Sequence, residues 1–274
     1  ATRVGRMVWG CRVPHRETPM PDARTLLILC PLVFIGSFVD AIGGGGGLVT
    51  LPAYLFVGLP AHLAIGTNKM SSMVGTSFST LRYIRSGFVD WKFAAPCVVC
   101  ALGMSFIGAR LSMALPEEVF RWVLICALPA VAFISLRKKS LRQESEPMPR
   151  RRRAAIMCAV ALACGLYDGF YGPGTGTFLI LGYSTIAKLG VRDCAGQTKC
   201  ANLASNIAGF VSFVLSGQTW LLLGAIASVF SITGHYIGAG MVVRDGSRIV
   251  RPIIVCVLVI LFAKTLGEAF GLVA

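Results

Sequence analysis

Long apolar stretches alternate with short polar segments along almost the whole chain. Eight of these stretches are long enough to cross the roughly 30 Å hydrocarbon core of a bilayer as helices. They cover residues 25–43, 66–84, 93–113, 119–136, 154–171, 196–215, 219–241 and 249–272. The pattern predicts an all-α fold, that of a polytopic membrane protein with about eight transmembrane helices.

Two shorter apolar pieces interrupt this series, at Leu48–Leu59 and Thr177–Leu189. Each piece follows a cluster of glycines and is too short to span a bilayer comfortably. Non-helical backbone at membrane depth is tolerated only where protein or a water-filled cavity surrounds it. We therefore expect both pieces to be re-entrant or broken and to lie beside a transport pathway.

The composition favours a lipid environment over a water-facing surface, because 55% of the residues are hydrophobic and only 14% are charged. A formal net charge of +14 on a soluble chain would suggest a nucleic-acid surface. Here the basic residues lie between the apolar stretches, as topology signals do. We expect a lipid bilayer around the protein and no nucleic acid partner.

Basic residues are densest in the tail 1–24 and in the segment 137–153. The positive-inside rule places both in the cytoplasm of a multi-pass membrane protein. The tail before Met20 is polar, so we expect the native start to lie close to that residue. The basic loop that contains Arg244 and Arg251 would then face outward, which leaves an inverted repeat open as an alternative.

An internal repeat with a period near 130 residues divides the chain. The matched positions are Asp40, Gly44 and Gly46 with Asp168, Gly172 and Gly174 at an offset of 128, then Gly66 and Lys69 with Gly196 and Lys199 at an offset of 130. We expect two homologous membrane repeats, 25–136 and 154–274, which the basic linker 137–153 joins. Whether the repeats are parallel or inverted stays open.

Each repeat carries one aspartate beside its glycine cluster and one lysine in the following span. A charge at the centre of a bilayer costs at least about 2.5 kcal/mol, so such residues indicate function by default. One interpretation is structural, with ion pairs inside each repeat that let the broken helices close. Asp40 would then pair with Lys69, and Asp168 with Lys199.

The other interpretation is that the lysines bind a small anion. Positions three and seven residues after each lysine share its helix face, and all of them are polar. Glycines let a backbone approach a ligand, and the N–H groups at a broken helix start attract anions. The candidate substrate-binding residues are Lys69, Lys199, Ser72, Thr76, Asn202, Asn206, Thr67, Gln197, Gly44, Gly46, Gly172 and Gly174.

Other motifs indicate less. His235 could relay protons, or it could be a hydrogen-bonded packing residue. Gly43–Gly47 lacks the Gly-Lys-Ser/Thr of a phosphate-binding loop, so we expect no nucleotide. Cys97 and Cys100 form one CxxC inside an expected span, with no second pair at metal-binding spacing, and we expect no metal and no cofactor.

At these residues the chain resembles the TauE/SafE sulfite-exporter (TSUP) family, particularly its YfcA-type branch. The segments that carry the resemblance are DAIGGGGGLVTLPAYLFVGLPAHLAIGTNKMSS at 40–72, YDGFYGPGTGTFLILGY at 167–183 and QTKCANLASNIAGF at 197–210. The resemblance implies a bacterial inner-membrane carrier for sulfite, sulfonates or sulfoacetate, driven by an ion gradient. The run of five glycines at Gly43–Gly47 differs from the spaced glycines at 172–176, so the two half-sites need not be equivalent.

Together these observations favour a secondary transporter that binds a small anionic substrate between its two repeats. Asp40 and Asp168 would neutralise the lysines or, with His235, take up coupling protons. A passive anion channel is an alternative, because the same polar lining would conduct if it were open to both sides. An intramembrane enzyme using these acids and His235 is a further alternative. Helix faces rich in small residues fit internal packing or a homo-oligomer equally well.

Overall fold

The structure is a computed structural model that describes residues 20–116, 118–119 and 144–245 of the 274-residue chain. Within these ranges the regular secondary structure is entirely helical. The expected span at 249–272, and all but the first residue of the one at 119–136, lie outside the described residues.

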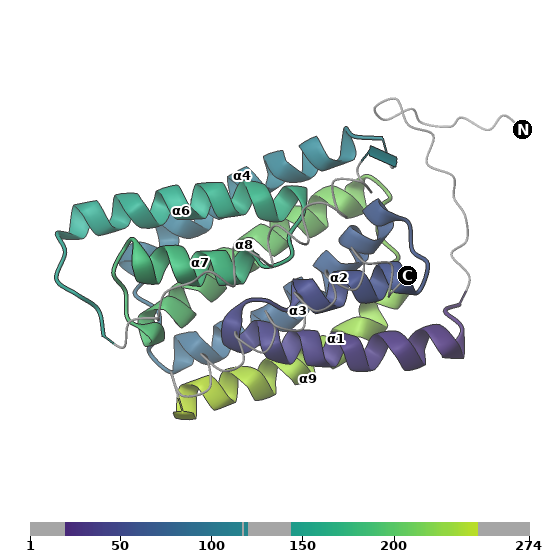
Figure 1. The fold of residues 1–274 in the computed structure, drawn as a ribbon, viewed down its shortest axis with the longest axis horizontal. Helices are drawn as coiled ribbons and strands as arrows, with labels where there is room; N and C mark the ends of the chain where they lie inside the picture. The colour runs from purple at the N-terminus through teal and green to yellow at the C-terminus, as the bar shows by residue number, and fades with distance from the viewer. Residues whose placement is uncertain (1–19, 117, 120–143, 246–274) are drawn as a thin grey trace, which may run out of the picture.

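The two halves of the chain contain the same elements in the same order, a long helix, a short helix and two more long helices (Figure 1). The first half has α1 (Ala23–Gly43), α2 (Gly47–Phe56), α3 (Ala61–Arg85) and α4 (Trp91–Met113). The second half has α6 (Arg150–Phe170), α7 (Thr175–Thr185), α8 (Val191–Leu215) and α9 (Leu221–Asp245). Both ends of α8 lie 130 residues after the corresponding ends of α3.

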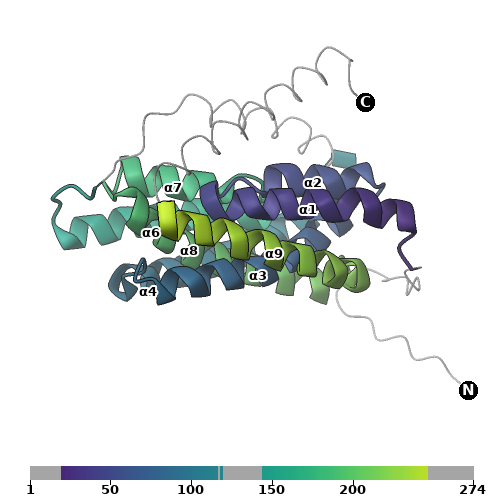
Figure 2. The same ribbon diagram turned by 90° about the horizontal axis from the view of Figure 1, so that it is seen from below.

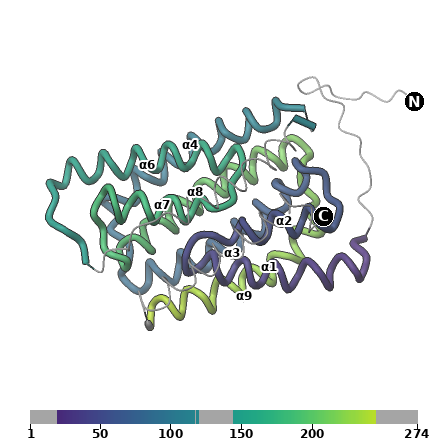
Figure 3. The backbone as a smooth tube through the Cα atoms, in the orientation of Figure 1, coloured from purple at the N-terminus to yellow at the C-terminus, as the bar shows by residue number. Residues whose placement is uncertain are grey.

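The short helices form hairpins with the helices that precede them. Figure 3 shows α2 running back beside α1 toward the end of the bundle where α1 begins, and α7 running back beside α6 in the same way. The short pieces inferred from the sequence are therefore helical, and each hairpin enters and leaves the bundle at one end. Such a hairpin contributes no net crossing of the bundle.

The two halves are inverted relative to each other. α1 and α6 run in opposite directions along the long axis of the bundle, and their first residues lie at opposite ends of it (Figures 1 and 2). Arg24 and the basic group Arg150–Arg153 therefore lie at opposite ends. This arrangement differs from the expectation that both basic segments face the cytoplasm, which counted α1 as a full crossing that α2 does not reverse.

The hairpin tips touch each other inside the bundle. A Cβ atom on Gly44 would lie 2.2 Å from the carbonyl carbon of Gly176, so only glycine fits there. The backbone N–H of Thr177 donates to the carbonyl oxygen of Gly44 at 3.1 Å. Gly44 also has a φ of +73°, a left-handed conformation that glycine adopts without strain. The glycine cluster thus permits a backbone-to-backbone contact between the two halves.

Four of the described helices, α1, α4, α6 and α9, are long and apolar enough to cross a membrane. α4 packs against α6 and α1 against α9, while α3 and α8 contact each other between them. Several large apolar side chains on α4 and α9 are exposed, which suits a surface in lipid. They include Val99, Leu102, Leu111, Val229 and Phe230. The buried lysines, Lys69 and Lys199, lie on the inner helices α3 and α8, and Asp40 and Asp168 lie near the ends of α1 and α6, at the hairpin tips.

Candidate functional site

Each membrane lysine forms an ion pair with the aspartate of the opposite half. Lys69 Nζ on α3 lies 2.6 Å from Asp168 Oδ2 on α6, and Lys199 Nζ on α8 lies 2.6 Å from Asp40 Oδ2 on α1. The expected pairing within each repeat is therefore wrong. Its physical cause is the inversion of the halves, which presses each hairpin tip against the long polar helix of the other half.

The Lys69 half-site consists of Lys69, Asp168 and Asn206, and it encloses the lysine ammonium group closely. Lys69 and Asp168 each expose only 3% of their side chains. The Lys69 ammonium also donates to Asn206 Oδ1 at 3.3 Å. Gly172 leaves room for it, since a Cβ atom on that residue would lie 3.1 Å from Nζ. Gly209 leaves similar room beside the aliphatic part of the lysine.

The Lys199 half-site has more partners around its carboxylate. Lys199 Nζ donates to the Asp40 carbonyl oxygen at 2.5 Å as well as to its carboxylate. The backbone N–H of Gly46 donates to Asp40 Oδ1 at 3.1 Å. His235 on α9 places Nε2 3.2 Å from Asp40 Oδ2. Asp40 exposes 14% of its side chain, so it is the least buried of the four charged residues.

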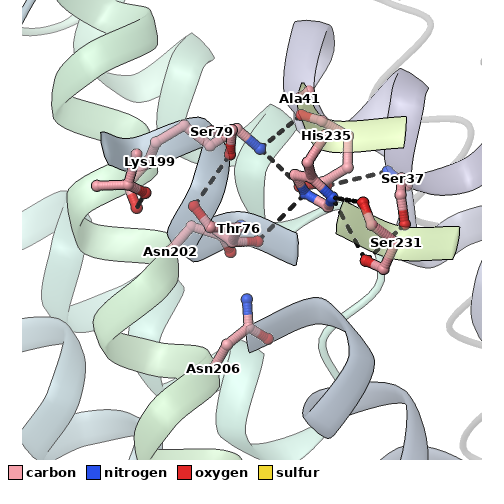
Figure 4. Close-up of polar contacts among 12 residues, drawn as sticks. Ser37, Ala41, Thr76, Ser79, Lys199, Asn202, Asn206, Ser231 and His235 are labelled. Carbon is pink, nitrogen blue, oxygen red and sulfur yellow. Dashed lines mark hydrogen bonds and ion pairs between the residues drawn. The ribbon is translucent and has the colours of Figure 1, made fainter. Parts of the chain in front are cut away.

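His235 is buried in a network of hydroxyl groups, as Figure 4 shows. Its Nδ1 atom lies 3.0 Å from the carbonyl oxygen of Ser231, and its Nε2 atom 3.3 Å from Thr76 Oγ1. The hydroxyl of Ser37 donates to that of Ser231 at 2.8 Å. At the repeat offset of 130 residues His235 corresponds to Ser105, whose hydroxyl donates to the carbonyl of Ser205 at 2.7 Å. The two half-sites are thus chemically different.

A small cavity of about 30 Å³ lies between the hairpin tips and the two polar helices. It is lined by Asp40, Gly44, Gly47, Asn68, Lys69, Ser72, Asp168, Gly172, Gly174, Thr175, Gly176, Asn202 and Asn206. A water molecule needs roughly 10–15 Å³ measured in this way, so the cavity has room for one or two waters. An oxyanion of four or more heavy atoms fits only if the surrounding groups move apart.

Most of the site residues expected from the sequence meet at this cavity. Lys199, Thr76 and His235 do not line it but lie in the network around Asp40, which does. Gly46 acts through its bond to Asp40. The rest of the expected set lines the cavity, apart from Thr67 and Gln197.

Thr67 and Gln197, which were expected to bind substrate, do not line the cavity and have other partners. The Thr67 hydroxyl accepts a hydrogen bond from the backbone N–H of Trp220 at 3.0 Å. The Gln197 amide donates to the carbonyl of Asp90 at 3.0 Å. Positions two residues apart on an α-helix are separated by about 200° around the helix axis. Thr67 and Gln197 each precede a lysine by two residues, so their side chains point to the opposite side of the helix from the lysines and bind connecting loops.

Four residues that line the cavity are absent from the set expected from the sequence, namely Gly47, Asn68, Thr175 and Gly176. Asn68 lines the cavity and is 8% exposed, and its side-chain oxygen is without a hydrogen-bond partner among the described residues. The signal was present, because Asn68 precedes Ser72 by four residues and therefore shares its helix face. A buried amide oxygen without a donor is costly in a membrane, and because that oxygen can only accept, a bound oxyanion would be contacted by the N–H groups of the Asn68 amide instead.

The arrangement is suited to exchanging a carboxylate for another anion. The N-termini of α2 and α7 both point toward the cavity, through Gly47 and Thr175, and favour negative charge there. With a neutral imidazole, two lysines and two aspartates give the site no net charge. The described residues include no group of three or more His, Cys, Asp or Glu side chains that could hold a metal ion.

A family model and several relatives of this chain all describe membrane transporters. Residues 29–265 match the family model described as sulfite exporter TauE/SafE. A probable membrane transporter protein of Haemophilus influenzae is 33% identical over 242 residues, which are 87% of this chain and 93% of that protein. The probable membrane transporter protein ORF9 of a Sinorhizobium species is 31% identical over 243 residues, which are 89% of this chain and 93% of that protein.

The similarity extends to a protein of Escherichia coli K12, the probable membrane transporter protein YfcA. It is 29% identical over 245 residues, which are 89% of this chain and 90% of that protein. No solved structure matches this chain.

Proposed function

Since the chain belongs to the sulfite exporter TauE/SafE family, we propose that it is a secondary transporter of small sulfur-containing oxyanions in the cell inner membrane. Sulfite, sulfonates and sulfoacetate are the substrates that this proposal covers. An ion gradient would drive their movement. That the protein is a multi-pass membrane transporter follows from its family and its apolar helices.

The observation that carries the proposal is the pair of crossed ion pairs at the contact between two inverted hairpins. Each lysine is already held beside an anion, the carboxylate of Asp40 or Asp168. A substrate oxyanion that replaces this carboxylate keeps the ammonium group paired, so the exchange leaves no isolated charge in the membrane. The side-chain N–H and O–H groups of four residues that line the cavity would donate hydrogen bonds to its oxygens, those of Asn68, Ser72, Asn202 and Asn206.

The inverted halves supply a route for alternating access. Each hairpin reaches the cavity from its own end of the bundle, so withdrawal of one tip opens the site toward one side only. Because the tips share the Gly44–Gly176 contact, opening on either side requires that contact to break. The cavity of about 30 Å³ is too small to pass an oxyanion, which favours this mechanism over a passive anion channel.

The test is uptake of radiolabelled sulfite into proteoliposomes under an imposed proton gradient, with empty liposomes as the background. We expect saturable, gradient-dependent uptake. Taurine and sulfoacetate are tested in parallel as a sulfonate and a sulfonated carboxylate. If none of the three is taken up by folded protein, the sulfur-oxyanion assignment fails.

The variants for this experiment remove a whole ion pair, so that no charge is left unpaired. The first combines Lys69→Met with Asp168→Asn, and the second combines Lys199→Met with Asp40→Asn. We expect both to elute as folded protein in detergent and to lose uptake. Lys92→Met is the matched control, because Lys92 is an exposed lysine at the start of α4. Normal uptake by either double variant contradicts direct binding by that lysine.

A further inference from the structure

We propose that His235 is the proton-binding residue that couples transport to a proton gradient, and that it serves only the half-site of Lys199 and Asp40. This inference rests on the proposed transport function and specifies how the coupling is built.

The first step is the difference between the two half-sites. The pair of Lys69 and Asp168 is completed by Asn206, whose amide neither gains nor loses a proton near neutral pH. The pair of Lys199 and Asp40 is completed by an imidazole, the one side chain whose unperturbed titration falls between about pH 5 and 8. An imidazole that can gain or lose a proton is therefore present in only one of the two half-sites.

The second step is the position of the proton on the ring. Nδ1 of His235 faces the carbonyl oxygen of Ser231 at 3.0 Å, and a carbonyl oxygen can only accept. With the single proton of the neutral imidazole on Nδ1, Nε2 carries a lone pair, which can accept from the hydroxyl of Thr76 at 3.3 Å. Nε2 also faces the carboxylate of Asp40, which can only accept, so a neutral ring leaves one of its two acceptor contacts without a proton. Uptake of a proton lets the ring donate at both Nδ1 and Nε2.

The third step is what protonation does to Asp40. Nε2 lies 3.2 Å from Asp40 Oδ2, the same oxygen that Lys199 Nζ contacts at 2.6 Å. A lone pair on Nε2 repels that oxygen, whereas an N–H on Nε2 donates to it with assistance from the positive charge. Protonated His235 therefore competes with Lys199 for the carboxylate. Lys199 is released to pair with the substrate, and Asp40 stays paired with the imidazolium.

Charged and polar groups from several helices surround His235. Lys199 on α8 opposes a second positive charge, and Asp40 on α1 favours one. On α3, Tyr83 donates to the carbonyl of Ala41, while Arg82 stacks on the ring of Tyr236 and donates to its carbonyl. Ser231 and Thr76 offer uncharged partners, and the Lys69–Asp168 pair is neutral as a unit. Asp40 is the only carboxylate in direct contact with the imidazole among the described residues.

Charge balance then gives a stoichiometry. A proton moves from the bulk solution to Nε2 and raises the charge of the site from zero to one, and no covalent bond other than N–H forms or breaks. A bound monovalent oxyanion returns the charge to zero. Release of the anion lets Lys199 recover the carboxylate and expel the proton. The expected coupling is one proton for each monovalent anion, moving in the same direction.

The decisive experiment compares two transport modes in proteoliposomes for wild type and His235→Gln. Glutamine keeps an amide donor near Nε2 but cannot take up a proton. We expect the variant to elute as folded protein and to lose gradient-driven accumulation at least tenfold, and we expect its residual exchange of labelled for unlabelled substrate to be independent of pH, whereas that of wild type rises on acidification. His62→Gln is the matched control, since His62 is also a buried histidine, with Nε2 3.1 Å from the Ser112 carbonyl. We expect that control to retain gradient-driven accumulation.

The outcomes separate this inference from the proposed function. If wild type shows neither exchange nor accumulation of any tested anion, the proposed function fails. If wild type is gradient-driven and His235→Gln remains so, only the role of His235 is overturned. Should the variant not fold, proton uptake by wild type is measured when substrate is added in weakly buffered detergent solution. Uptake of about one proton per bound monovalent anion supports the inference, and none overturns it.

Discussion

Gly44 and Gly176 belong to opposite halves of the chain, yet their backbones are in direct contact at the hairpin tips. A Cβ atom on Gly176 would lie 2.5 Å from the Cα atom of Gly44. Because the contact involves backbone on both sides, no side-chain rearrangement can relieve a substitution there. The two tips are thereby held in one position around the cavity.

Substitution of Gly44 by alanine tests this contact. The positive φ of Gly44 alone costs a non-glycine residue of order 1–3 kcal/mol, and the clash with Gly176 adds to that. We expect Gly44→Ala to lower the melting temperature in detergent and to abolish uptake. Gly103→Ala is the control, because a Cβ atom on Gly103 would meet nothing within 4 Å. A Gly44→Ala protein as stable as that control would contradict the close contact.

The crossed pairing predicts which double substitutions restore stability. Removing Lys69 alone leaves Asp168 buried without its partner, at a cost of about 3–5 kcal/mol. We expect Lys69→Met to melt at a lower temperature than wild type, and addition of Asp168→Asn to recover most of the loss. Addition of Asp40→Asn to Lys69→Met instead removes the ion-pair partner of Lys199. We expect this double variant to melt at a still lower temperature. Recovery with Asp40→Asn would favour pairing within one repeat.

Asn68 is expected to contribute to substrate binding. A hydrogen bond to a charged group contributes about 1.5–3 kcal/mol, which corresponds to a tenfold to roughly hundredfold change in affinity. We therefore expect Asn68→Ala to raise the KM of uptake by at least tenfold. The neighbouring Thr67→Val is the control, since the Thr67 hydroxyl bonds the backbone of Trp220 and not the cavity. Its effect is expected on melting temperature, with KM unchanged.

A cross-link between the hairpin tips tests whether they separate during transport. A Cβ atom on Gly47 would lie 3.7 Å from the Cβ atom of Pro173, within the 3.5–4.5 Å typical of a disulfide. We expect the double variant Gly47→Cys, Pro173→Cys, in a background without the native cysteines, to lose uptake on oxidation. A reductant should restore it. Each single cysteine variant is the control, and full uptake by the oxidised double variant would show that transport needs no separation of the tips.

The sequence predicts the components of the site better than their assembly. The repeat offset identifies Lys69 and Lys199 as equivalent, and the helical spacing correctly places Ser72, Asn202 and Asn206 beside the cavity. Equivalence, however, says nothing about which aspartate each lysine meets. That depends on the direction of the halves, and direction depends on whether α2 and α7 return to the end where their hairpins began.

Hydropathy could not resolve that direction. A ten-residue helix such as α2 has the same hydropathy whether it crosses the bundle or returns to the end where its hairpin began. The basic segments were then assigned to one side on an incorrect count of crossings. Thr67 and Gln197 were expected at the cavity for a simpler reason, since nearness in sequence to a lysine was taken for nearness in space. The contact of His235 with Asp40 joins residues 195 positions apart, and no local pattern reveals it.

Crossed pairing also bears on how such a chain could have arisen. Neither half can neutralise its own lysine, because the matching carboxylate is always contributed by the other half. A chain consisting of one half alone would need a second copy inserted in the opposite orientation before its charges were balanced. Gene duplication and fusion of such a dual-topology dimer would place both orientations in a single polypeptide. The two copies could then diverge, and a histidine acquired by only one of them would break the original twofold equivalence.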